Sequence, residues 1–310
     1  MFRDLPGEYR FMCSGYPKRL AGAFLIMMAV FLLTPDVGVR AEEKPIKVVA
    51  SFYPVYIMAQ NVVRDVPGVT VTSLTPPVSG CLHDYALTTN DMKKLEGADI
   101  LVVNGAGMEA FLDRIMLQYP QIRIITLSEG IPLIKGIGAE GDNPHVWVSI
   151  SNAIAEVRNL GVHMEAADAG HAELYRSNTR VYVDKLTVLQ QRMQAGLAPY
   201  KGRKIITFHE AFPYFARAFG LEVAAVVTRE PGSEPGAREL ADTIDLVKKS
   251  GIKALFSEPQ YPSLAAQTIA RETGAVVYAL DPAVSGPDVP EAYLKIMEKN
   301  LEVLKNAFSK

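Results

Sequence analysis

Two kinds of hydrophobic pattern alternate along the chain. Short apolar runs rich in Val and Ile are typical of buried β-strands, and longer stretches with apolar residues three or four positions apart are typical of helices. The two patterns alternate between Ile46 and Leu127 and again between Lys204 and Phe308. Such alternation predicts an α/β fold with two mostly parallel sheets whose faces are covered by helices.

The expected elements follow these patterns. Strands are expected at Ile46–Ser51, Val69–Leu74, Ile100–Asn104, Ile122–Leu127, Lys204–Phe208, Leu221–Thr228, Ala254–Ser257 and Ala275–Leu280. Helices are expected at Val55–Val66, Thr89–Glu96, Met108–Gln118, Ser151–Ala167, His171–Ala195, Tyr214–Phe219, 236–250, Ser263–Thr273 and Glu291–Phe308.

The longest of these helices is expected to connect two lobes. His171–Ala195 contains no Pro or Gly, and at 1.5 Å per residue it would be roughly 35–40 Å long, enough to cross a domain. We therefore expect one rigid helix between two β/α lobes that move by small rocking, not by wide hinge closure. The expected divisions are residues 1–41 as a signal peptide, 42–168 as the N-terminal lobe, 169–198 as the connecting helix and 199–310 as the C-terminal lobe.

The first residues have the features of a cleavable leader. Lys18 and Arg19 precede an apolar run from Leu20 to Leu33, and Val39-Arg40-Ala41 offers small residues for a signal peptidase. The run is short for a membrane span. We therefore expect an exported mature chain that starts at Glu42 and is not inserted in the membrane.

The composition excludes several classes of protein. Hydrophobic residues make up 49% of the 310, which is enough for a sizeable core. The net charge of −2 gives no basic footprint for nucleic acid or anionic lipid. Cys81 is the only cysteine after the predicted leader, so the mature chain cannot form an internal disulfide. Cys81 lies two residues before His83 and could be a soft metal ligand, but a small buried thiol is the simpler interpretation.

Four polar residues follow predicted strands. His209 and Asp281 come directly after strands of the second half, and His83 and His145 lie in loops after strands of the first half. Ligands of open parallel sheets bind beyond the carboxyl ends of the strands, so each lobe is expected to deliver two of these side chains. Three imidazoles and one carboxylate suit Zn²⁺, which binds such ligands at about 2.0–2.2 Å. The sequence therefore predicts a metal site in the cleft between the lobes, unless one or two of the four are ordinary loop residues.

Two neighbouring features bear on this site. Glu258 also ends a predicted strand, and it could either accept the imidazole N–H of a ligand histidine or cap the helix that follows. Pro144 stiffens the backbone before His145, and Val146 and Trp147 are expected to bury this corner in the core.

Five stretches give the chain a resemblance to a known family. They are Thr75–Pro77 with His83–Tyr85, Asn143–Trp147, Thr207–Phe212, Ser257–Gln260 and Leu280–Pro282. Over nearly its whole mature length, the chain resembles the solute-binding proteins of zinc and manganese ABC importers. The resemblance implies two β/α lobes, a rigid connecting helix, one metal ion between the lobes, and a periplasmic location. It also implies delivery of the ion to a membrane permease that works with a cytoplasmic ATPase.

The resemblance further implies a ligand set. His83, His145 and His209 correspond to ligands, and Asp281 occupies the fourth and most variable position. Manganese members generally carry a carboxylate where this chain has His209, and Mn²⁺ prefers oxygen, so Zn²⁺ is expected over Mn²⁺. The chain lacks the histidine-rich loop of many zinc members and the cysteine pair that some relatives have in the C-terminal lobe.

The expected function is therefore binding, not catalysis. The chain would act as a monomer that captures Zn²⁺ and delivers it to an ABC importer, without binding nucleic acid. The main alternative is capture of Mn²⁺ or another divalent metal for the same type of importer. Two further alternatives are a surface adhesin and an exported zinc hydrolase, in which Glu258 would be the base if Asp281 does not bind the metal.

Overall fold

The computed structural model describes residues 44–77, 82, 85–136, 141–227, 235–261 and 264–309. Lys44–Lys310 form one compact unit. The predicted signal peptide, its cleavage before Glu42, and the positions of Cys81 and His83 lie outside the described residues. Within the described part of the chain, no helix is both long and apolar enough to cross a membrane.

The first sheet holds four parallel strands in the order β2-β1-β3-β4. They are β1 (Ile46–Ala50), β2 (Val69–Ser73), β3 (Ile100–Val103) and β4 (Arg123–Thr126). All four residues of β3 are buried, which is typical of an inner parallel strand with helices on both faces. The alternation of apolar runs therefore predicted this sheet correctly.

The second sheet repeats the same arrangement in the order β6-β5-β7-β8. Its parallel strands are β5 (Lys204–Thr207), β6 (Glu222–Val226), β7 (Ala254–Ser257) and β8 (Val276–Ala279). Strand β7 takes the inner place of β3 and is likewise fully buried. Two similar parallel sheets confirm the predicted α/β class.

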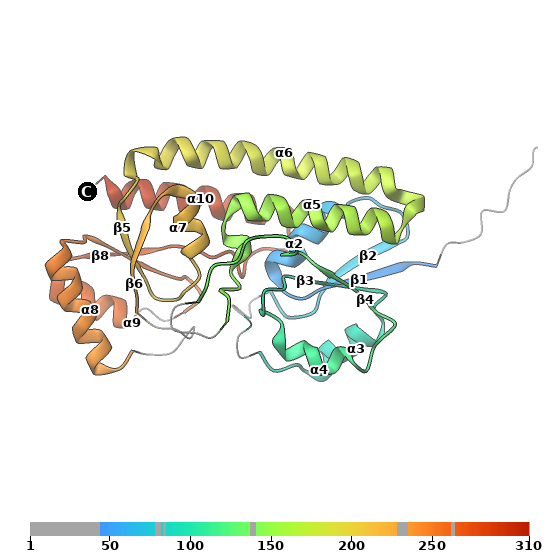
Figure 1. Cartoon of the computed structure of the whole chain (residues 1–310), viewed down its shortest axis with the longest axis horizontal. Coiled ribbons are helices and arrows are strands. Elements are labelled where there is room, and N and C mark those ends of the chain that lie inside the picture. Colours follow the sequence, from blue (N-terminus) through green and yellow to red (C-terminus); the bar gives the residue numbers. More distant parts are fainter. Residues whose placement is uncertain are drawn as a thin grey trace, which may run out of the picture. The chain divides into compact units, whose positions relative to one another are not determined.

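Helices cover both sheets (Figure 1). They are α2 (Tyr53–Val62), α3 (Thr89–Glu96), α4 (Asp113–Met116), α5 (Ile150–Ala167), α6 (Ala172–Leu197), α7 (Pro213–Phe219), α8 (Ala237–Ser250), α9 (Leu264–Thr273) and α10 (Ala292–Phe308). The start of α3 has a reciprocal cap, in which Thr88 accepts from the backbone of Asp91 and Asp91 accepts from the backbone of Thr88.

The helix predicted at Met108–Gln118 is wrong in extent. The chain forms only a 3₁₀ turn at Ala110–Leu112 and the single turn of α4. The cause is the loop after β3, where Gly105, Ala106 and Gly107 have φ values of 81°, 53° and 86°. This loop extends to Glu109, whose carboxylate accepts from the backbones of Asn104 and Gly105, so the first residues of the predicted helix belong to the loop.

Helix α6 lies along both lobes (Figure 1). It packs against α2 and α5 on the N-terminal side and against α7 and α10 on the C-terminal side. Its 26 residues correspond to about 39 Å. The main hydrophobic core is also shared, because one cluster extends from Val48 of β1 through Tyr182 of α6 to Phe308 of α10. The predicted divisions at residues 168 and 199 stay predictions, since contacts group 44–310 as one unit.

Candidate metal centre

The structure brings His145 and His209 together. His209 lies just beyond β5, and His145 lies in the loop between β4 and α5. Their ring centroids are 4.6 Å apart and the rings are nearly perpendicular, at 81°. Their exposed fractions are 1% and 2%. The carboxyl ends of two different sheets thus deliver two imidazoles to one buried place, as the strand-end argument predicted.

Asn143 orients the ring of His145. The Asn143 Nδ2 donates to the carbonyl of Glu210 at 2.8 Å, which turns Oδ1 towards His145. Oδ1 accepts the backbone N–H of His145 at 3.0 Å and lies 3.1 Å from its Nδ1. A carbonyl oxygen only accepts, so Nδ1 carries the proton and Nε2 carries the lone pair that can bind a metal.

Glu258 orients the ring of His209 in the same way. Its Oε1 lies 2.8 Å from His209 Nδ1, and both side chains are only 2% exposed. A carboxylate that accepts the hydrogen bond of Nδ1 leaves Nε2 as the ligand atom, which is a common arrangement around metal-bound histidines. Of the two roles considered for Glu258, contact with an imidazole is therefore the one observed.

Asp281 is fixed by three neighbours. Its Oδ1 accepts from Gln260 Nε2 at 2.9 Å and from the backbone of Ala283 at 2.8 Å. Asn300 of α10 accepts the Asp281 N–H at 3.0 Å and donates to its carbonyl at 2.7 Å. Burial raises the pKa of Asp281, and the bonds from Gln260 and Ala283 oppose that shift. Gln260 and Glu258 belong to one segment, which therefore supports both Asp281 and His209.

Gln260 and Asn300 are the supporting residues that sequence reasoning missed. Gln260 lies inside the stretch quoted for the family resemblance, but no role was assigned to it. Asn300 is 1% exposed on the packed face of α10, between apolar residues. The sequence did contain a signal for Asn300, because a lone polar residue at a core position of an amphipathic helix needs a hydrogen-bond partner.

Contacts between the lobes hold the His145 segment in place. Trp147 is fully buried, and its Nε1 donates to the carbonyl of Pro282 at 2.8 Å, next to Asp281. Tyr293 of α10 donates to the carbonyl of Trp147 at 2.7 Å. Tyr214 of α7 donates to the carbonyl of Asn143 at 2.8 Å. The predicted burial of this corner is confirmed, and the side chains that bury it come from both lobes.

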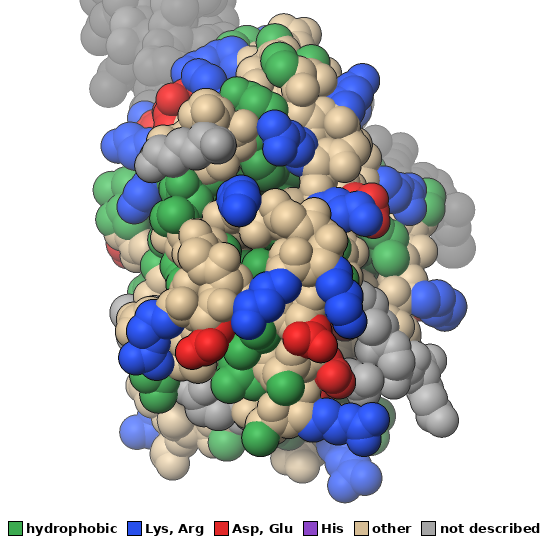
Figure 2. Space-filling model, turned by 90° about the vertical axis from the view of Figure 1, so that its left-hand side faces the viewer, with side chains coloured by type: hydrophobic (Ala, Val, Ile, Leu, Met, Phe, Trp, Pro, Cys, Tyr) green, Lys and Arg blue, Asp and Glu red, His purple; other side chains and the backbone are tan. Residues whose placement is uncertain are grey.

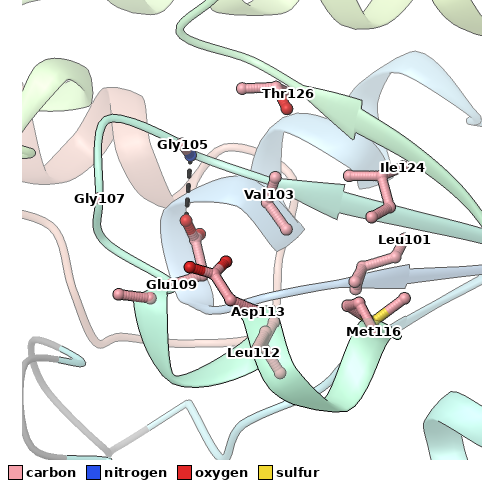
Figure 3. Close-up of a pocket in the computed structure, with 11 residues that line it drawn as sticks. Leu101, Val103, Gly105, Gly107, Glu109, Leu112, Asp113, Met116, Ile124 and Thr126 are labelled. Atoms are coloured by element: carbon pink, nitrogen blue, oxygen red, sulfur yellow. Dashed lines mark hydrogen bonds between the residues drawn. The ribbon is translucent and has the colours of Figure 1, made fainter. Parts of the chain in front are cut away.

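A separate cavity of about 440 Å³ lies between β3, β4 and the turn of α4 (Figure 3). Its walls are largely apolar, and the carboxylate of Glu109 lies on one side. Glu109 accepts from Ser51 Oγ at 2.7 Å and from the backbones of Asn104 and Gly105 at 2.8 and 3.0 Å. Burial raises the pKa of Glu109 to about 7, and these hydrogen bonds oppose the shift. Asn104 Nδ2 in turn donates to the carbonyl of Pro144 at 2.9 Å, so this loop supports the backbone before His145.

The structure describes three of the four predicted ligands. His145 and His209 are in contact, Asp281 is linked to them through the Glu258–Gln260 segment, and His83 falls outside the described residues. Within the described ranges alone, no group of three or more His, Cys, Asp or Glu side chains is complete enough to hold a metal ion. The joint assignment of all four residues therefore stays a prediction.

Comparisons with known proteins agree with this architecture. The sequence profile of the family described as "ZnuA: Zinc-uptake complex component A periplasmic" matches residues 48–307. The zinc-binding protein AdcA of Streptococcus pyogenes is 30% identical over an alignment that covers 88% of this chain. The chain spans only 58% of the length of that relative.

Two further matches cover almost the whole of the related protein. The high-affinity zinc uptake system protein ZnuA of Bacillus subtilis is 29% identical, over 94% of this chain and 98% of that protein. The structure of the solute-binding protein FpvC of Pseudomonas aeruginosa in complex with Mn²⁺ is 31% identical and has a TM-score of 0.77. That match covers 86% of this chain and 99% of FpvC.

Proposed function

The chain belongs to the family of periplasmic zinc-uptake complex component A proteins, and we propose that it captures Zn²⁺ and delivers it to the membrane permease of an ABC importer. The observation that carries this proposal is the contact between His145 and His209. Each ring has its Nδ1 next to an oxygen acceptor, Asn143 Oδ1 or Glu258 Oε1. Each Nε2 therefore presents a lone pair of the kind that Zn²⁺ binds.

We propose His83, His145, His209 and Asp281 as the ligands of one bound ion, which is the cargo of the protein. Two imidazoles that are already oriented lose little conformational freedom when they bind, so the site is prepared for tight capture. Asp281 would contribute an oxygen to a set rich in nitrogen. That set favours Zn²⁺ over Mn²⁺, which prefers oxygen ligands and stands lowest in the divalent affinity series.

A hydrolytic role fits the site less well. A zinc hydrolase needs a base that activates the metal-bound water. The proposed candidate, Glu258, is buried and its Oε1 is engaged with His209 Nδ1, which suits an orienting role. We therefore propose a binding protein without catalytic activity.

Capture and release should involve small movements. The two lobes share one core, and Trp147, Pro282 and Tyr293 hydrogen bond across the lobes. Wide opening would break these bonds and expose the core. We propose slight rocking of the lobes with local movement of the loops that carry the ligands.

Metal binding to the purified mature chain tests the proposal. Zn²⁺ and Mn²⁺ affinities should be measured by competition with chelators for the wild type, His145→Ala and His209→Ala. We expect one Zn²⁺ per chain, weaker Mn²⁺ binding, and loss of tight Zn²⁺ binding in both variants. A wild-type chain that stays free of metal in excess Zn²⁺ would overturn the proposal. The predicted periplasmic location is tested by the N-terminal residue of the exported protein, expected to be Glu42.

A further inference from the structure

Basic side chains gather where the strands of the second sheet begin (Figure 2). This end of the molecule is where α6 ends and β5 starts, on the left in Figure 1. We call it the basic edge and define it by six exposed residues from the start of β5, the start of β7 and the last turn of α8. They are Lys201, Arg203, Lys204, Lys248, Lys249 and Lys253.

The corresponding edge of the first sheet has a different charge pattern. Lys47 of β1 lies opposite Asp99, the residue that precedes β3. Asp99 also accepts from Lys44 Nζ at 2.9 Å and from the backbone of Lys47. In the second sheet, Ile206 pairs with Leu255, and the same register places Lys204 beside Lys253, the residue that precedes β7. A lysine thus stands where the first sheet has an aspartate.

Acidic residues compensate the basic edge only weakly. Lys204 lies 3.5 Å from Glu222 and Lys249 lies 3.7 Å from Asp245, and all four side chains are largely exposed. Exposed pairs of this kind contribute little. Lys201, Lys248 and Lys253 form no ion pair with any residue that the structure describes.

Local helix electrostatics explains only part of the basic edge. Lys248 and Lys249 lie in the last turn of α8, where a positive charge is favourable next to the helix C-terminus. Lys204 and Lys253 lie on neighbouring strand starts, where like charges repel each other. An arrangement that repels itself and lacks internal partners is the kind that an external anionic surface would stabilise.

We infer that the basic edge is an electrostatic docking face for the anionic phospholipid surface of a membrane. Five of the six residues are lysines, which act as compact point charges, and they are spread over strand starts and a helix end. That distribution matches a plane of headgroups better than a single bound anion. The inference goes beyond metal capture and rests on the proposed function only for placing the chain next to a membrane.

Vesicle co-sedimentation at low ionic strength tests this inference. The probes are vesicles of phosphatidylcholine alone and of phosphatidylcholine mixed with phosphatidylglycerol. The test variant is K248E/K253E. The matched control is K93E/R123E, because Lys93 is in the last turn of α3 and Arg123 starts β4, so both variants change the same charge at the same kinds of position. Zn²⁺ affinity is measured for all three proteins.

The wild type and the control should bind the vesicles that contain phosphatidylglycerol, and salt should weaken that binding. K248E/K253E should bind at least about tenfold more weakly, since each basic residue near an anionic surface contributes about 1 kcal/mol. Zn²⁺ affinity should be the same in all three proteins. A failure of vesicle binding can therefore be told apart from a failure of metal capture. Equal binding to both kinds of vesicle, or unchanged binding by K248E/K253E, would overturn the inference. Absence of vesicle binding by the wild type would also overturn it and would favour an acidic protein surface as the partner of this face.

Discussion

Replacement of Glu258 by Gln separates the binding role of this carboxylate from a structural one. In the wild type, Oε1 lies 2.8 Å from His209 Nδ1, and Glu258 as a whole is 4% exposed. The carboxylate favours the proton on Nδ1 and raises the donor strength of Nε2. Gln has nearly the same shape but no charge, so it should keep the packing and lose this electronic effect.

The expected magnitude follows from the burial of the pair. Loss of the outer partner of a metal-bound histidine weakens metal affinity by about 10- to 100-fold, which is about 1.4–2.7 kcal/mol. The metal-free protein should respond differently, because the variant also removes a buried negative charge. Its stability should stay within about 1 kcal/mol of the wild type or increase.

Glu258→Gln should therefore weaken Zn²⁺ binding without destabilising the metal-free protein. Zn²⁺ affinity is measured by chelator competition, and the stability of the metal-free protein is measured by urea unfolding. The control is Glu272→Gln, an exposed carboxylate on α9 of the same lobe, which should change neither quantity. A Zn²⁺ affinity for Glu258→Gln within about twofold of the wild type would refute the orienting role. A parallel loss of affinity and stability would show that Glu258 acts through the fold alone.

Three further predictions concern stability. A Cβ at Gly161 would lie 2.9 Å from Thr179 Cγ2, so Gly161→Ala should cost about 1–3 kcal/mol in thermal unfolding, and T179A added to it should recover part of that loss. Burial raises the pKa of Glu109 from 4.5 to about 7, so the native state keeps the Glu109 proton to a higher pH than the unfolded chain does. As pH rises from about 4.5 to 7, the metal-free wild type should therefore lose about 3 kcal/mol more stability than Glu109→Gln. The pKa of buried Glu156 is also raised and contributes in both proteins, so equal losses in the two would contradict this. Zn²⁺ at 100 times its Kd should stabilise the protein by about 2.7 kcal/mol, so an unchanged Tm after chelation would argue against a bound ion.

The hydrophobic pattern marks the inner strands β3 and β7 most clearly, because all of their residues are buried. Runs such as Ile100–Val103 have no polar residue, and periodicity marks them clearly. It failed at Met108–Gln118, where the pattern is helical but the left-handed backbone at Gly105–Gly107 and the side chain of Glu109 close a loop instead. The conformation of that loop depends on contacts that a local pattern does not contain.

The sequence likewise predicted some residues of the candidate site and missed others. Strand-end position was enough to single out His145, His209 and Glu258, since the topology of parallel sheets fixes where strand ends meet. Gln260 and Asn300 were missed because their roles depend on hydrogen bonds to Asp281. The net charge of −2 also suggested no surface for anionic lipid, whereas the basic edge shows that a sum over the chain hides local separation of charge.

Burial of Trp147 makes the two halves of the chain depend on each other for folding. Its indole lies in a core built by both halves of the chain, and its polar atoms bond to Pro282 and Tyr293 of the other half. Neither half expressed by itself could cover that indole. The protein should therefore melt in one cooperative step, and a gene split within α6 should yield fragments that are insoluble apart and recover solubility only when produced together.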